Sequence, residues 1–215
     1  MNGLRAVDQS GDPPRLPADS DAARDLVKAV TFALEGIPHR IAYRSALDYL
    51  GLLSPPARTV HVATAGSVGF ALLGRRPLRT ILENETDLAV GADPVDRTFV
   101  SDPERAILDA ASRPDLIGHA TALAVAIAAV APSLDIDRMV DYASRLPVDA
   151  GVRRIGSIAG QLGFSRITKE LLPPPELGAS VVLDPKGPMK KVWYDERWGV
   201  HWNRHRDEFT EARNR

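Results

Sequence analysis

Apolar residues near the start of the chain follow the spacing of helices. A helix is predicted from Ser20 or Asp21, either of which can cap it, to about Glu35, where a Gly-Ile-Pro segment follows. Its buried face is expected to carry four apolar residues: Leu26, Val27, Val30 and Ala33. A second, shorter helix is predicted over residues 43–50, with Gly51 at its end.

The pattern changes to alternation between residues 59 and 100. Short runs rich in β-branched residues, separated by turns that contain Gly and Pro, predict strands at 60–63, 79–82, 87–90 and 97–100. Short strands joined in this way favour a small antiparallel sheet in the N-terminal half.

Helical spacing returns after Val100. Ser101 is expected to cap a helix, with Pro103 in the first turn and Glu104 completing a capping box. This helix is predicted to run to about residue 112, and further helices are predicted at 114–131, 135–146 and 149–162. Strands are expected again at 180–183, 191–194 and 200–202, and the last two can pair.

These elements predict an α+β fold with a small antiparallel sheet in the N-terminal half, a helical bundle and a short C-terminal β piece. Three regions are expected along the chain. Residues 1–19, rich in Pro, Gly, Asp and Ser, form a disordered tail, residues 20–100 an α+β subdomain, and residues 101–215 a helical subdomain with the terminal β piece.

The composition suits a globular protein with a buried core, since 44% of the 215 residues are hydrophobic and 26% are charged. The absence of cysteine excludes disulfides and thiolate metal sites, which fits a reducing compartment. The first residues lack the apolar stretch of a signal peptide, and the longest apolar run, Thr121–Ala131, is too short to span a bilayer. We therefore expect a soluble, cytoplasmic protein that does not enter membranes.

The formal net charge of −1 conceals an uneven distribution. Residues 1–150 carry 15 Lys and Arg against 20 Asp and Glu, whereas residues 151–215 carry 12 against 8. A basic C-terminal part can contact a polyanion or an acidic partner. An uneven but ordinary solvated surface explains the same counts.

Two basic groups are the candidate nucleic-acid or partner-binding residues. The first is interleaved with Trp193, Tyr194, Trp198 and Trp202, and it consists of Lys186, Lys190, Lys191, Arg197, Arg204 and Arg206. The second lies at or after a predicted helix and consists of Arg153, Arg154, Arg166 and Lys169. In the alternative interpretation, the aromatic residues seal the C-terminal β piece onto the helices and the second group is a solvated helix face.

Motifs for catalysis are sparse. Thr64-Ala65-Gly66-Ser67, followed by Glu85 and Asp87, faintly resembles a nucleotidyltransferase site, because residues two apart on a strand share one face. A charged hairpin explains the two carboxylates more simply. His201 and His205 have i,i+4 spacing, but the surrounding pattern is that of a strand. We expect no catalytic residue, no metal, no cofactor and no enzymatic activity.

The order of several segments resembles that of AbiEi-family antitoxins. Residues 41–52 (IAYRSALDYLGL) resemble the Ser-Ala-Leu…Gly-Leu helix of that family, and the strand at 59–63 follows as it does there. Val100–Asp109 is similar to the family's S-x-P-E-[RK]-[AT]-[LI]-x-D helix start, and Arg153–Gly163 (RRIGSIAGQLG) matches a later helix. The resemblance covers about residues 37–170.

The resemblance implies an antitoxin that neutralises a nucleotidyltransferase-like toxin and can autoregulate transcription at operator DNA. Family members commonly begin with a winged helix-turn-helix, whereas here only about twenty ordered residues precede Ile37, too few for that three-helix module. The similar part is thus the C-terminal antitoxin domain. The alternatives are a nucleic-acid-binding regulator without a cognate toxin and a nucleotidyltransferase-like enzyme, and the sequence leaves the oligomeric state open.

Overall fold

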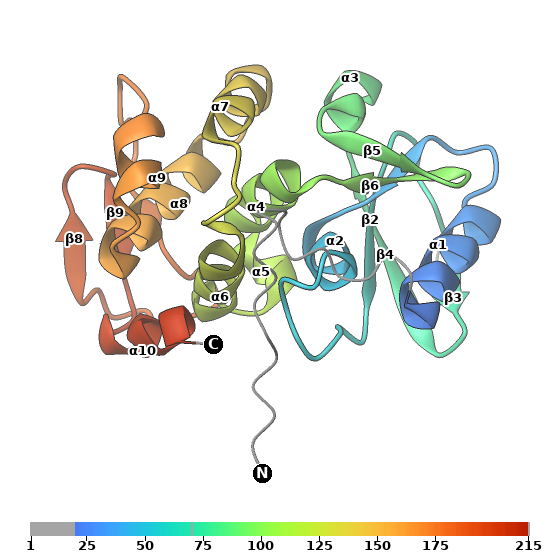
Figure 1. Ribbon diagram of the computed structural model, residues 1–215, viewed down its shortest axis with the longest axis horizontal. Helices are drawn as coiled ribbons and strands as arrows, with labels where there is room; N and C mark the ends of the chain where they lie inside the picture. Colours follow the sequence, from blue (N-terminus) through green and yellow to red (C-terminus); the bar gives the residue numbers. More distant parts are fainter. Residues whose placement is uncertain (1–19, 70, 215) are drawn as a thin grey trace, which may run out of the picture.

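The computed structural model describes residues 20–69 and 71–214. A six-stranded sheet lies at one end of the molecule, helices fill the middle, and a three-stranded sheet lies at the other end (Figure 1). The predicted α+β class is confirmed. The predicted tail over residues 1–19 lies outside the described residues.

The N-terminal sheet has the strand order β3-β4-β2-β1-β6-β5. Its strands are β1 (His39–Ile41), β2 (Val60–Thr64), β3 (Ala71–Leu73), β4 (Arg76–Leu82), β5 (Ala92–Val95) and β6 (Thr98–Ser101). Pairs β1–β2, β3–β4 and β5–β6 are antiparallel, but β2–β4 and β1–β6 are parallel. The sheet is therefore larger than expected and mixed, because sequence alternation predicts strands but not the direction of partners that are distant in the chain.

Two helices pack against this sheet. Helix α1 (Asp21–Ala33) begins as predicted, with the Ser20 side chain accepting a hydrogen bond from the Ala23 amide at 3.2 Å. It buries Val27 and Val30 and lies beside β3 and β6. Helix α2 (Tyr43–Tyr49) packs against β2 and α4.

The predicted strand at 87–90 is wrong, because this segment belongs to helix α3 (Glu85–Ala89). Asn84 caps the helix, and its side-chain oxygen accepts a hydrogen bond from the Asp87 amide at 2.8 Å. Four residues of alternating polarity are too weak a signal to outweigh a capping residue that satisfies a free amide.

Helix α4 (Pro103–Ser112) begins one residue later than predicted. Its cap is Asp102, which accepts a hydrogen bond from the Arg105 amide at 2.8 Å, and not Ser101, which ends β6. Glu104 does not complete a capping box and instead accepts a hydrogen bond from the Asp135 amide at 2.9 Å. Ser and Asp are both favoured at the N-cap, so the sequence alone could not show which of Ser101 and Asp102 caps the helix.

Helix α4 lies at the centre of the helical region, against α2, α6, α7 and α8. The helix predicted over residues 114–131 is divided at Gly118, which has φ 108°. The remaining helices of this region are α5 (Pro114–Ile117), α6 (Ala120–Val130), α7 (Ile136–Arg145), α8 (Asp149–Leu162) and α9 (Ser165–Glu170). No helix among the described residues is both long enough and apolar enough to span a membrane.

The C-terminal sheet has the strand order β7-β9-β8. Its strands are β7 (Val181–Val182), β8 (Trp193–Asp195) and β9 (Val200–Trp202), and β8 pairs antiparallel with β9 as predicted. Helix α10 (Asp207–Thr210) and a 3₁₀ turn (Glu211–Asn214) follow and contact α6.

Candidate nucleic-acid and partner interface

The inner face of the C-terminal sheet is an aromatic layer against α8. Trp202 is fully buried and stacks on Trp193, with the ring centroids 5.1 Å apart. Its indole nitrogen donates to the Ser157 hydroxyl of α8 at 2.8 Å, and its ring meets the edge of Phe209. Trp198 is also buried. These contacts confirm the interpretation in which the tryptophans seal the β piece onto the helices.

Arg153 and Arg154 belong to the same attachment, because their side chains are buried in α8. Arg153 donates from Nε to the Trp198 carbonyl at 2.8 Å, from Nη1 to Ala179 at 2.9 Å and from Nη2 to Gly199 at 2.6 Å. The five donors of a guanidinium suit such a set of loop and strand carbonyls. As a correction to the expected basic surface, the guanidinium of Arg153 does not face solvent.

Arg154 makes a parallel connection. Its Nε donates to the Val182 carbonyl in β7 at 3.0 Å, and its Nη1 donates to the Ala111 carbonyl in α4 at 2.8 Å. Burial, and then the neighbouring charge of Arg153, lower the pKa of Arg154 to about 10. The side chain thus ties the C-terminal sheet to the central helix, and it too leaves the predicted surface.

The outer face of the same sheet carries a row of three exposed or half-buried side chains. Backbone register places Val182 of β7 and Tyr194 of β8 on either side of His201 in β9. The rings of Tyr194 and His201 have centroids 4.5 Å apart and planes tilted by 37°. Tyr194 is 43% exposed and Val182 is 39% exposed.

His201 was not among the predicted site residues. Partial burial, and then the positive charge of Lys191, lower the pKa of His201. The sequence signal that could have identified it was the alternation Val200-His201-Trp202, which places His201 opposite the two buried neighbours.

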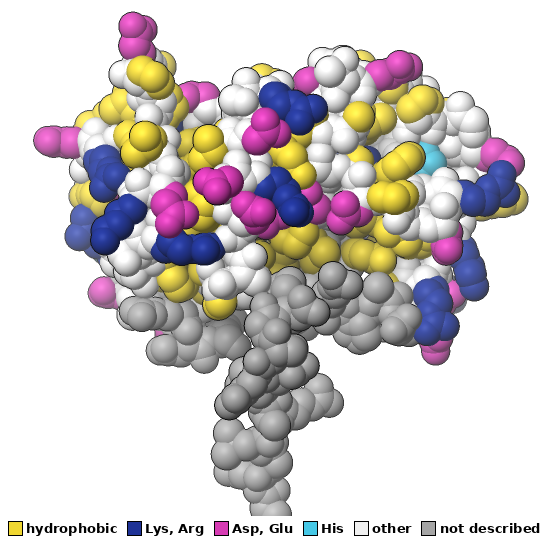
Figure 2. All heavy atoms as spheres, turned by 45° about the horizontal axis from the view of Figure 1, so that its top comes forward, with side chains coloured by type: hydrophobic (Ala, Val, Ile, Leu, Met, Phe, Trp, Pro, Cys, Tyr) yellow, Lys and Arg dark blue, Asp and Glu magenta, His cyan; other side chains and the backbone are white. Residues whose placement is uncertain are grey.

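Lys190 and Lys191 are two exposed cations that precede β8 in the chain. Both are exposed, and neither forms an ion pair within the described part of the chain. Lys186 and Lys169 are exposed too, but the ammonium of Lys186 donates to the Asp115 carbonyl at 2.6 Å. Figure 2 shows Lys and Arg side chains at its left edge, the end of the molecule that carries this sheet, and others at its right edge.

The arginines of the predicted site are held by local contacts. Arg206 lies over the Trp193 ring at 3.6 Å, and Arg197 lies 5.4 Å from the Trp198 ring while donating to the Thr168 carbonyl. Arg166 donates to the Leu134 carbonyl. Arg204 pairs with the buried Asp184 and with Glu208, so its main contacts are internal. Arg206, Arg197 and Arg166 remain exposed.

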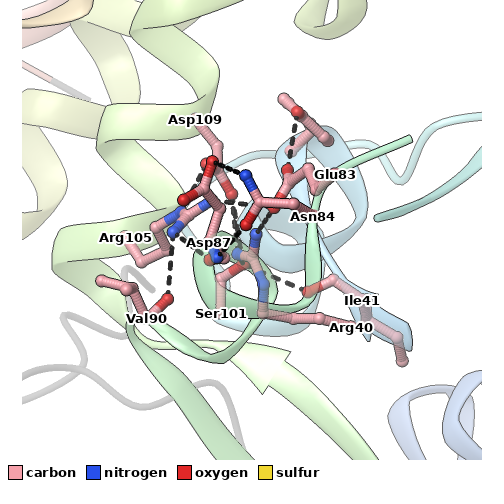
Figure 3. A network of polar contacts seen from close by, with 10 residues as sticks. Arg40, Ile41, Glu83, Asn84, Asp87, Val90, Ser101, Arg105 and Asp109 are labelled. Carbon is pink, nitrogen blue, oxygen red and sulfur yellow. Dashed lines mark hydrogen bonds and ion pairs between the residues drawn. The ribbon is translucent and has the colours of Figure 1, made fainter. Parts of the chain in front are cut away.

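A second polar cluster, missed by the sequence analysis, lies where the N-terminal sheet meets α4 (Figure 3). Arg40 donates to Asp109 at 2.8 Å and to Glu83 at 2.8 Å, and Arg105 donates to Asp109 at 2.7 Å and to Glu83 at 2.9 Å. The Tyr43 hydroxyl adds a hydrogen bond to Glu83 at 3.0 Å. Two cations and two carboxylates thus compensate each other, and we interpret the cluster as a structural link.

The arrangement suggested for a nucleotidyltransferase site is not present. Glu85 and Asp87 lie in helix α3. In a helix, two residues correspond to a rotation of about 200° about the axis, so the two side chains lie on nearly opposite sides and do not share a face. The Thr64 hydroxyl donates to the Gly66 carbonyl at 2.9 Å within its own turn. Among the described residues, no group of three or more His, Asp or Glu side chains is placed to hold a metal ion.

Comparison with known proteins identifies a shared fold. The crystal structure of the RV2827C protein from Mycobacterium tuberculosis matches with a TM-score of 0.61, covering 88% of this chain and 70% of that chain at 13% sequence identity. At this identity the likeness concerns the fold alone. No family model matches the chain, and no curated protein matches it.

Proposed function

We propose that this chain is a non-enzymatic regulatory protein of the AbiEi antitoxin type, which neutralises a nucleotidyltransferase-like toxin by direct contact in the cytoplasm. The observation that carries the proposal is a pair of exposed lysines, Lys190 and Lys191, near a sheet face with the exposed ring of Tyr194 and the half-buried ring of His201. Cationic and aromatic side chains are common anchors of macromolecular interfaces.

The firm attachment of the C-terminal sheet to the helices supports the same role. The buried guanidinium of Arg153 holds three backbone carbonyls around the C-terminal sheet, and Trp202 is packed between the sheet and α8. A sheet that is held rigidly before binding loses less conformational entropy when a partner binds to its surface. The exposed lysines extend from a firmly attached unit and not from a free tail.

The family resemblance supports the antitoxin role specifically. Its segments at 41–52 and 100–109 correspond to α2 and to the start of α4, which pack against each other in the centre of the molecule. Arg105 and Asp109, within the second segment, are members of the buried charge cluster. In our proposal these motif residues stabilise the scaffold, and the surface that carries Lys190 and Lys191 contacts the toxin.

Growth rescue tests the proposal. A neighbouring nucleotidyltransferase-like gene is induced alone, with this protein, and with its Lys190→Gln, Lys191→Gln double variant. We expect the wild-type protein to restore growth and the double variant to restore less, because the loss of two charges weakens an electrostatic contact. A Lys28→Gln, Arg79→Gln variant, which removes two exposed cations from the other end of the chain, is the matched control. Absence of rescue by the wild-type protein would refute the antitoxin role.

A second candidate function is a nucleic-acid-binding regulator without a toxin. The exposed Lys190 and Lys191 favour it, since cations that neutralise phosphates give a salt-dependent affinity for nucleic acid. Its test is a gel shift on the protein's own promoter over a salt series. Binding that weakens with salt, together with no growth rescue in the toxin assay, favours this second candidate.

A further inference from the structure

Among the described residues, the outer face of the C-terminal sheet exposes Val182 and Tyr194 on its outer strands and leaves His201 half-buried on its central strand. Helices α8 and α10 cover only the inner face, where Trp202 lies against Ser157 and Phe209. On the outer face, Val182, His201 and Tyr194 form one row across all three strands. Met189, which is 99% exposed, lies in the segment that leads into β8.

The two rings of this row make a surface of the size and chemistry of a nucleobase contact. Their centroids are 4.5 Å apart and their planes are tilted by 37°, so Tyr194 and His201 pack against each other and each ring keeps one face turned away from the other. Bases stack on aromatic side chains of exposed sheet strands in several nucleic-acid-binding folds. Bases in a duplex are stacked on their neighbours, so only an unstacked base can place its face on these rings.

The charges near the row suit a polyanion. Residues 186–206 contain six Lys and Arg against two acidic residues, Asp195 and Glu196. The carboxylate of Asp195 faces inward, since it accepts hydrogen bonds from the Ser157 hydroxyl at 2.6 Å and from the Trp198 amide at 3.3 Å. Lys190 and Lys191, which precede β8 and form no ion pair within the described residues, thus lie close in the chain to the exposed ring of Tyr194, and cations beside an aromatic ring suit a base and its phosphates.

We infer that the outer face of the C-terminal sheet binds single-stranded nucleic acid, with an unpaired base on the rings of Tyr194 and His201 and phosphates near Lys190 and Lys191. The inference shares the C-terminal surface with the proposed function and goes beyond that function. It adds the class of partner and the residues that would distinguish single strands from duplexes.

Fluorescence anisotropy tests the inference with a labelled twelve-nucleotide thymidine strand and a twelve-base-pair duplex as probes. We expect tighter binding of the single strand, and a loss of about fivefold or more in affinity for it in Tyr194→Leu. Tyr194→Phe keeps a ring and is expected to bind within twofold of the wild-type protein. Phe32→Leu, at an exposed aromatic residue on α1, is the matched control and is expected to leave binding unchanged.

The salt dependence separates stacking from charge. Removal of both lysines, in Lys190→Gln with Lys191→Gln, is expected to reduce the slope of log affinity against log salt by about 1.4, whereas Tyr194→Leu leaves the slope unchanged. Circular dichroism melts show whether each variant is folded. Equal binding by wild type and Tyr194→Leu, equal losses in Tyr194→Leu and Phe32→Leu, or no binding of the single strand would each overturn the inference.

The growth assay distinguishes this failure from a failure of the proposed function. Rescue by the wild-type protein, combined with no binding of the single strand, refutes the nucleic-acid inference and leaves the antitoxin proposal standing. Ring-dependent binding of the single strand without any rescue supports the inference and refutes the antitoxin proposal.

Discussion

The two ends of the molecule are attached to the central helices by buried arginines that use different partners. At the N-terminal sheet, Arg40 and Arg105 are compensated by the carboxylates of Glu83 and Asp109. At the C-terminal sheet, Arg153 and Arg154 donate mainly to backbone carbonyls. A carboxylate cancels the charge of its partner, whereas a carbonyl dipole only solvates it. The first attachment therefore depends on charge balance and the second on geometry.

Removal of one carboxylate from the N-terminal cluster gives the largest expected effect. Asp109→Asn leaves Arg40 and Arg105 buried with Glu83 as their one carboxylate, and we expect a loss of about 3–5 kcal/mol in the free energy of unfolding. Urea denaturation measures it. The matched control is Asp141→Asn, which breaks an exposed pair with Arg145 and is expected to cost at most about 0.5 kcal/mol. Similar losses in both variants would show that the buried cluster contributes no more than a surface pair.

Acid titration provides a second test at the N-terminal end. Burial, and then the charges of Arg79 and Arg44, lower the pKa of His61 in β2 to about 4. The unfolded chain binds this proton near pH 6.5, so the stability is complete above about pH 6.5 and is lost as the pH falls toward 4, by at most about 3 kcal/mol.

Urea denaturation at pH 7 and pH 4.5 measures this loss. In His61→Gln the part of the loss that comes from this histidine is expected to disappear. An undiminished loss in the variant would assign the acid sensitivity to other groups.

A smaller effect is expected from the packing of the C-terminal attachment. A Cβ added at Gly156 would lie 2.2 Å from the Trp198 ring, so Gly156→Ala must displace a rigid buried side chain. We expect a net loss of about 1–2 kcal/mol in the free energy of unfolding and a shift in tryptophan fluorescence.

Gly160→Ala is the control in the same helix, because its added Cβ meets its nearest neighbour, Thr168, at an ordinary 3.7 Å. It is expected to be neutral or slightly stabilising, since alanine favours the helix. Destabilisation of the same size at both positions would mean that Trp198 is not held tightly against α8.

The sequence predicted those elements that local signals specify. The cap at Ser20, the helix at 149–162 and the pairing of β8 with β9 all depend on residues that are close in the chain. The parallel pairs of the sheet and the contact of Arg40 with Asp109, 69 residues away, depend on tertiary packing that no local pattern encodes.

The candidate site was predicted in part for the same reason. Cation counts identified the C-terminal region, and Lys190 and Lys191 are exposed there. The counts could not reveal that Arg153 and Arg154 are buried, because arginines bound to carbonyls and arginines in water have the same sequence pattern. His201 was overlooked as a site residue because its half-buried ring gains significance only beside Tyr194.

The charge cluster of Figure 3 also governs how the chain can be divided for expression. A truncation after residue 100 would retain Arg40 and Glu83 but lose Arg105 and Asp109, and it would expose the apolar side of α2 that packs on α4. A shortened N-terminal fragment should therefore extend through Ser112, so that all of α4 accompanies the sheet.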